Sequence, residues 1–145
     1  MEQPGRPSDE HVRGIYATTR TIAVVGASAN DDKPANRIPR YLQAQAYRIL
    51  PVNPKEDEIL GERVYRSLRD IAVPVDVVDV FRPPAEAEQI AMDAVAIRPR
   101  VLWFQPGTHT GEAIRIATDA GLTVVAERCM GHTHRVLGLG PGPEG

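Results

Sequence analysis

Short, continuous runs of apolar residues recur along the chain and alternate with segments of helical spacing. The first run, Thr21 to Val25, is rich in β-branched residues and stops at Gly26. Apolar runs without polar alternation are typical of strands that are buried on both faces of a parallel sheet. The same criterion predicts further strands at residues 47–52, 75–81, 100–104 and 122–125.

Helical spacing occupies most of the gaps between these strands. Ser8, followed by Asp9 and Glu10, predicts the start of a short helix that ends near Thr19. Other helices are predicted around residues 38–42, 85–97 and 111–120. Between Asn53 and Val75 the pattern is broken, and we expect a loop, a brief turn and one short helix near residues 67–71.

Strands that alternate with helices indicate βαβ units and therefore an α/β fold. We expect a Rossmann-like, doubly wound sheet of five parallel strands with helices on both faces, in the order 3-2-1-4-5. A ligand would then bind at the carboxyl ends of the strands, at the switch point between strands one and four. The 145 residues suit a single domain spanning 1–145. We expect the leader (1–7) and the Gly/Pro-rich tail (138–145) to be flexible.

Charge and composition exclude several classes of partner. The chain carries 17 basic and 19 acidic residues without a long basic run, so we expect no nucleic-acid binding. Its first 20 residues contain no apolar core stretch, so we expect neither a signal peptide nor a membrane anchor. Cys129 is the only cysteine, which excludes an internal disulfide and favours a reducing compartment such as the cytoplasm.

The loops after the first two strands carry the main binding signal. Gly26, Ala27 and Ser28 follow the first strand, where a glycine lets an anion approach the backbone amides and a helix N-terminus. The alternative is a plain strand-to-helix turn. The Gly-x-Gly-x-x-Gly fingerprint is absent, and the second strand ends in Val52, Asn53 and Pro54 rather than an acidic residue. Both absences argue against a nicotinamide dinucleotide.

Basic residues follow the same two loops. Lys33, Arg37, Arg40 and Lys55 could meet phosphate groups, such as a 3′-phosphate on an adenosine ribose. For any one of them, solvated surface charge is the alternative interpretation.

The third and fourth loops offer further candidates. Phe81, Arg82 and Pro83 place an aromatic ring and a cation at a strand end, with core packing and a salt bridge as the alternatives. Gln105 and Gly107 either face the ligand or form a tight turn.

The segment after the fifth strand holds Cys129, His132 and His134. A metal site needs three or four ligands at suitable spacing, and only these three residues cluster here. We therefore discount a metal at this segment. A reactive thiol at Cys129, beside Arg128, is the less favoured alternative to a buried, inert one.

Together the loops resemble a known family. The carrying segments are Ile22–Ser28, Pro51–Pro54, Glu58–Gly61, Val75–Arg82, Trp103–Gly107 and Arg128–Cys129. The chain resembles the stand-alone CoA-binding domains, relatives of the CoA-binding domain in the succinyl-CoA synthetase α-subunit and in NDP-forming acyl-CoA synthetases. The resemblance covers roughly residues 10 to 137.

The resemblance implies how coenzyme A would lie. Gly26, Ala27 and Ser28 would hold the diphosphate, with Lys33 and Arg37 as phosphate contacts. The Val52–Pro54 turn would lie beside the adenosine. Phe81, Arg82, Pro83, Gln105 and Gly107 would line the pantetheine path. Two departures from the family pattern are Ala35-Asn36 after Lys33-Pro34, and Thr108-His109-Thr110 after Gly107.

Three functions follow as hypotheses. The first is a non-catalytic carrier, sensor or regulatory module that binds CoA or an acyl-CoA. The second is a subunit or partner of an NDP-forming acyl-CoA synthetase system. The third is an NAD(P)-binding oxidoreductase, which survives only through shared architecture. A homodimer or a protein partner stays open. We also expect a Gly26→Val substitution to block the diphosphate while leaving the fold largely intact.

Overall fold

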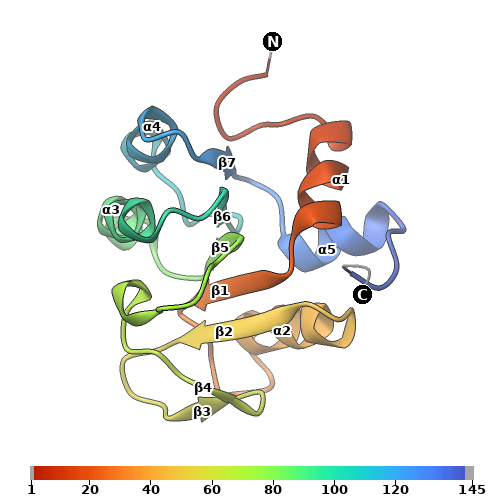
Figure 1. The fold of residues 1–145 in the computed structure, drawn as a ribbon, viewed down its shortest axis with the longest axis vertical. Coiled ribbons are helices and arrows are strands. Elements are labelled where there is room, and N and C mark those ends of the chain that lie inside the picture. Colours follow the sequence, from red (N-terminus) through yellow and green to blue (C-terminus); the bar gives the residue numbers. More distant parts are fainter. Residues whose placement is uncertain (1, 143–145) are drawn as a thin grey trace.

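The computed structural model describes residues 2–142, and its centre is one parallel sheet (Figure 1). The sheet has five strands in the order β2-β1-β5-β6-β7. Their bounds are β1 Thr21–Val25, β2 Arg48–Val52, β5 Val77–Val80, β6 Val101–Phe104 and β7 Thr123–Val125. The predicted fold class, a Rossmann-like α/β sheet, is therefore confirmed.

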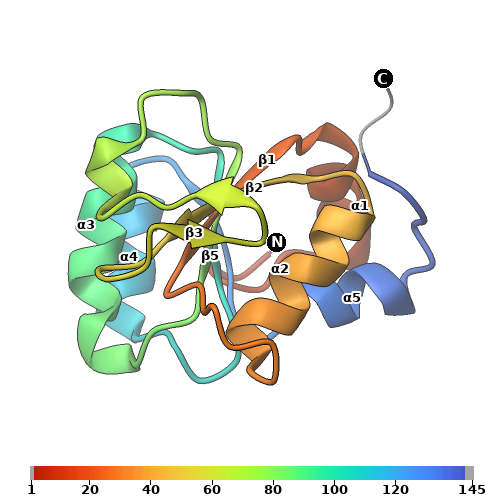
Figure 2. The ribbon, with the colours of Figure 1, turned by 90° about the horizontal axis from the view of Figure 1, so that it is seen from below.

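Helices cover both faces of the sheet (Figure 2). One layer contains α1 (Asp9–Thr18), α2 (Pro34–Ala44) and α5 (Met130–Val136); the other contains α3 (Ala87–Ile97) and α4 (Gly111–Asp119), with the short 3-10 helices η1 (Leu68–Asp70) and η2 (Pro84–Glu86) beside α3. Successive strand residues point to opposite layers. In β1, for example, Ile22 and Val24 belong to the core under α1, α2 and α5, whereas Ala23 and Val25 belong to the core under α3 and α4.

The predicted strand order was wrong, and the outer edge of β2 explains why. The third strand in the chain, β5, pairs with β1 instead of lying outside β2. That outer edge is occupied by Tyr65, whose amide donates to the Pro51 carbonyl at 2.9 Å and whose carbonyl accepts from the Asn53 amide at 3.0 Å. Pro51 also has no N–H to donate to a further strand, so β2 is an edge strand.

The corrected order moves the switch point. It lies between β1 and β5, the first and third parallel strands along the chain, and not between strands one and four. The loops that begin at Gly26 and Phe81 therefore flank each other at the carboxyl edge of the sheet. The loop that begins at Gln105 follows β6, one strand further away.

The segment between β2 and β5 contains a hairpin that the sequence did not predict. Its strands β3 (Glu58–Ile59) and β4 (Glu62–Arg63) are antiparallel and joined by Leu60 and Gly61. Both linking residues have positive φ, at 54° and 75°, as two-residue type I′ hairpin turns require. The predicted short helix is present as η1, with the Ser67 hydroxyl accepting from the Arg69 amide at 3.2 Å.

Parts of the leader and the tail, which we expected to be flexible, make contacts with the rest of the fold. In the leader, the Gly5 carbonyl accepts from the Ala126 amide at 2.9 Å, and Gly5 bridges Val125 at the open edge of β7. In the tail, Leu139 packs against the core under α1 and α2. Residues 143–145 of the predicted tail lie outside the described residues. Within residues 2–142, no helix is both long and apolar enough to cross a membrane.

Candidate functional site

Gly26 and Arg82 meet at the switch point. Gly26 has a φ of 85°, and a Cβ built on it would lie 2.6 Å from Arg82 Cδ and 3.0 Å from the Phe81 carbonyl oxygen. The Phe81 amide in turn donates to the Val25 carbonyl at 2.9 Å, which aligns the two loops. Only glycine combines this backbone conformation with so close an approach.

A cavity of about 280 Å³ opens beside this contact. The sequence-predicted residues Gly26, Val52, Asn53, Pro54 and Arg82 all line it, which brings three of the candidate loops together. The structure adds residues from η1, η2, α3 and the segment before η1: Arg66, Ser67, Leu68, Glu86, Gln89, Ile90 and Asp93. Loops at strand ends do not include these residues, because η1 and α3 form the opposite wall of the cavity.

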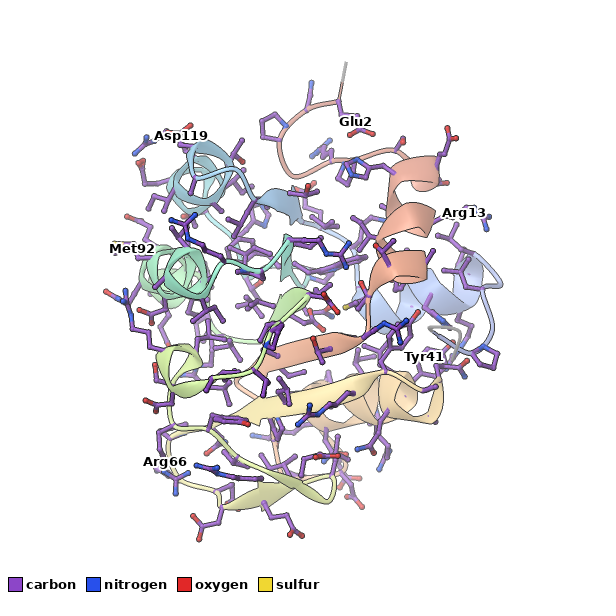
Figure 3. The ribbon with its side chains drawn as sticks, in the orientation of Figure 1. Glu2, Arg13, Tyr41, Arg66, Met92 and Asp119 are labelled. Carbon is purple, nitrogen blue, oxygen red and sulfur yellow. The ribbon has the colours of Figure 1, made fainter. Side chains whose placement is uncertain are left out.

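Asn53 fixes two of these loops to each other. Its Nδ2 donates to the Ala27 carbonyl at 2.9 Å, and its Oδ1 accepts from the amides of Lys55 at 2.7 Å and Glu56 at 3.0 Å. Arg66, on the outer side beside the β3–β4 hairpin (Figure 3), adds a bond from its Nη1 to the Asn53 carbonyl at 3.3 Å. The Asn53 side chain is therefore a brace between the loops after β1 and β2.

The loop after Gly26 leads into the N-terminus of α2. The Ser28 hydroxyl accepts from the Asn30 amide at 3.0 Å, and the Ser28 carbonyl accepts from Asn36 Nδ2 at 2.8 Å. Lys33 precedes the first turn of α2 without capping it through its side chain. Within residues 2–142, the exposed Ala29 amide has no acceptor. An uncapped helix end with a free loop amide is suited to an anion.

Arg82 is held by Glu86 at the cavity wall. Its Nη2 donates to Glu86 Oε2 at 2.6 Å and its Nε to Oε1 at 3.1 Å. These hydrogen bonds lower the pKa of Glu86 and raise that of Arg82. Both side chains are half-exposed, so water weakens the pair and Arg82 can exchange Glu86 for another anion at small cost.

The remaining predicted residues lie outside the cavity. Arg37 lines a separate groove between α2 and α5. Gln105 is buried, and its Oε1 accepts from the Met130 amide at 2.9 Å, which ties the loop after β6 to α5. Gly107 has open space around it. The half-buried Phe81 packs against the core, and the exposed Pro83 precedes η2.

A model of the CoA binding domain family matches residues 20–135. The chain belongs to the CoA-binding domain family. This confirms the resemblance inferred from the loop motifs.

Two relatives match this CoA-binding domain over nearly its whole length. It is 33% identical over 130 residues to the protein YneT of Bacillus subtilis (strain 168), a match covering 90% of this chain and 96% of YneT. A solved structure of a hypothetical protein from Pyrococcus horikoshii OT3 superposes with a TM-score of 0.89 at 38% identity, covering 94% of this chain and 96% of that one.

A third relative is a subunit of a larger enzyme. The domain is 27% identical over 135 residues to the alpha subunit of an ADP-forming acetate–CoA ligase II from Pyrococcus furiosus. The match covers 84% of this chain and 30% of that subunit. The CoA-binding domain is thus related to subunits of acyl-CoA synthetases, of which it spans less than a third.

The cysteine and histidines near the C-terminus of the CoA-binding domain do not converge. His134 is buried, and its Nδ1 shares a hydrogen bond with the Tyr41 hydroxyl at 2.8 Å. His132, two residues earlier on α5, is exposed, because residues two apart on a helix face different sides. The half-buried Cys129 caps α5, its Sγ accepting from the His132 amide at 3.5 Å.

Proposed function

We propose that this domain binds coenzyme A or an acyl-CoA in the cytoplasm and acts as a non-catalytic carrier, sensor or regulatory module. The observation that supports the proposal best is the contact of Gly26 with Arg82 at the β1–β5 switch point. It puts a guanidinium group at the start of the loop that leads to the free Ala29 amide and the N-terminus of α2, in a chain of the CoA-binding domain family.

The diphosphate would lie against the loop that starts at Gly26. Ser28 Oγ already accepts one bond, so its O–H can donate to a phosphate oxygen. The Ala29 amide, the N-terminus of α2 and Arg82 would supply further donors and positive charge. Lys33, just before α2, and Arg37, in its first turn, would contact phosphates from the outer side.

The remaining candidate residues would contact the adenosine and the pantetheine arm of the ligand. The Val52–Pro54 turn would contact the adenosine, because it lines the cavity next to Gly26. The pantetheine arm would run past Phe81 and Pro83 toward Gln105 and Gly107. No bond of the ligand needs to break for this role.

A second candidate is a partner in an acyl-CoA synthetase system. The similarity to the acetate–CoA ligase subunit favours it. It predicts that the domain accelerates acyl-CoA formation only when a separate nucleotide-handling protein is added. A carrier or sensor would bind CoA without changing that rate.

The direct test is calorimetric titration of ligand-stripped protein with CoA, dephospho-CoA and NAD. The proposal predicts tight CoA binding, weaker binding of dephospho-CoA and no NAD binding. Clear NAD binding without CoA binding would contradict it.

Substitution of Arg82 locates the site. Arg82→Ala removes one partly exposed charge contact, so we expect roughly a five- to tenfold rise in the CoA dissociation constant. The matched control is Arg115→Ala, since Arg115 also pairs with a carboxylate, Asp119 at 2.9 Å, and neither residue lines the cavity. Equal losses in both variants would place CoA elsewhere.

A further inference from the structure

A second concave surface lies between α2 and α5, which pack side by side on the face opposite α3 and α4 (Figure 2). We call it the α2–α5 groove. Its volume is about 460 Å³. The two helices approach closely at Gly131, where an added Cβ would lie 3.0 Å from Ile38 Cγ2.

Basic side chains line both sides of the α2–α5 groove. Arg37 and Arg40 come from α2, and His132 and Arg135 come from α5. Residues one turn apart on a helix share a face, so each pair projects along its own rim. No acidic residue of the described chain lines the groove.

The three arginines of the groove have no carboxylate partner within residues 2–142. Arg37 donates to the backbone carbonyl of Asp32. Arg135 lies over the Tyr41 ring, 4.9 Å from its centroid (Figure 3 labels Tyr41). Arg40 makes no ion pair among the described residues. Three arginines on or beside α3 and α4, by contrast, pair with acidic side chains: Arg69, Arg82 and Arg115.

An exposed apolar side chain lies next to these charges. Val136 is 66% exposed, the highest exposure among the large hydrophobic residues of the described chain. It follows His132 by four residues, so it lies on the same side of α5 as His132. Ala44, at the other end of the rim on α2, is exposed too.

We propose that the α2–α5 groove is a docking surface for an acidic segment of a partner protein. Unneutralised guanidinium groups on both rims attract a chain of carboxylates along the groove. A free phosphate would use a compact cluster of donors and would gain nothing from Val136, whereas a polypeptide covers both the charges and the apolar side chain. The inference does not rest on CoA binding.

The test uses a short fluorescein-labelled peptide of glutamate, aspartate and leucine, with a glutamine/asparagine analogue and inorganic tripolyphosphate as comparisons. Fluorescence anisotropy at low salt should show binding of the acidic peptide, weaker binding of its amide analogue, and loss of affinity as salt rises. The double variant Arg40→Glu/Arg135→Glu should weaken peptide binding by about tenfold or more. Its CoA affinity should fall much less than its peptide affinity, because neither residue lines the cavity beside Gly26.

The matched control is Arg48→Glu/Arg98→Glu, which makes the same change of charge at exposed arginines outside the groove. Equal losses in the two double variants would overturn the proposal, since non-specific charge attraction would then explain binding. Tripolyphosphate binding at the groove without peptide binding would also overturn it, in favour of a free phosphate ligand.

A second measurement needs no variant. Amide chemical shifts of the wild-type protein should change on peptide addition within residues 37–44 and 131–136. Changes centred elsewhere would contradict the assignment of the surface.

Discussion

Gly26, directly after β1, packs closely against the Arg82 side chain. A substitution at this position therefore affects both the stability of the fold and the proposed binding site. The structure contradicts the expectation that Gly26→Val would leave the fold largely intact. A side chain at Gly26 would meet Arg82 and the Phe81 carbonyl of the protein itself, and the φ of 85° disfavours any Cβ. Loss of CoA binding in that variant would therefore not locate the diphosphate.

A milder change separates the two effects. Gly26→Ala should lower the free energy of unfolding in urea by roughly 1–2 kcal/mol from the positive φ alone, with a further loss from the contact with Arg82. Gly107→Ala is the control, because Gly107 has a φ of 79° and open space around it. Equal destabilisation of the two variants would show that the contact costs nothing.

Asp79 has the most unusual environment of any carboxyl group in the described chain. It lies in the middle of β5 and is fully buried, and neither carboxyl oxygen has a hydrogen-bond partner among residues 2–142. Burial raises its pKa well above the ordinary value. The folded protein therefore retains this proton at pH values where the unfolded chain has lost it.

This proton has a measurable consequence. Above about pH 4, where the unfolded carboxyl ionises, stability of the wild type should fall by roughly 1 kcal/mol per pH unit relative to Asp79→Asn, until the folded pKa is reached. Urea unfolding of both proteins between about pH 4.5 and pH 7 measures the difference. Parallel pH profiles would mean that Asp79 ionises in the folded state as it does in the unfolded one.

At the scale of elements, the site depends on how the loops after β1 and β2 are joined. Asn53→Ala removes three hydrogen bonds between and within these loops and leaves the Ala27 carbonyl without its donor. We expect a loss of roughly 1–3 kcal/mol in unfolding free energy, together with weaker CoA binding. Asn30→Ala, which loses one local bond to the Asp32 amide, is the control. A stable Asn53→Ala variant with unchanged affinity would contradict the role of the brace.

The elements with a strong local pattern were predictable, and those set by distant partners were not. The apolar run at Thr21–Val25 identified β1, and Ser8 identified the start of α1, where its hydroxyl accepts from the His11 amide at 3.1 Å. The order of the strands depends on what covers β2, and the informative signal was Pro51, which favours an edge strand. Leu60-Gly61 carried a weak hairpin signal, because leucine rarely adopts positive φ.

At the scale of the whole molecule, the two helix layers carry different surfaces. The cavity beside Gly26 opens toward η1 and α3, whereas the α2–α5 groove lies on the other layer. Strand-end loops identified Gly26, Asn53 and Arg82 from sequence, since parallel strands bring such loops to one edge. The wall formed by Glu86 and Asp93 could not be predicted, because it depends on how α3 packs against η1.

The central claim is that coenzyme A binds at the β1–β5 switch point. A crystal structure of the protein with CoA tests it most directly. We expect the diphosphate within hydrogen-bonding distance of the Ser28–Ala29 loop, with the adenosine beside Asn53 and Arg82 near a phosphate. CoA bound in the α2–α5 groove, or at the amino ends of the strands, would contradict it.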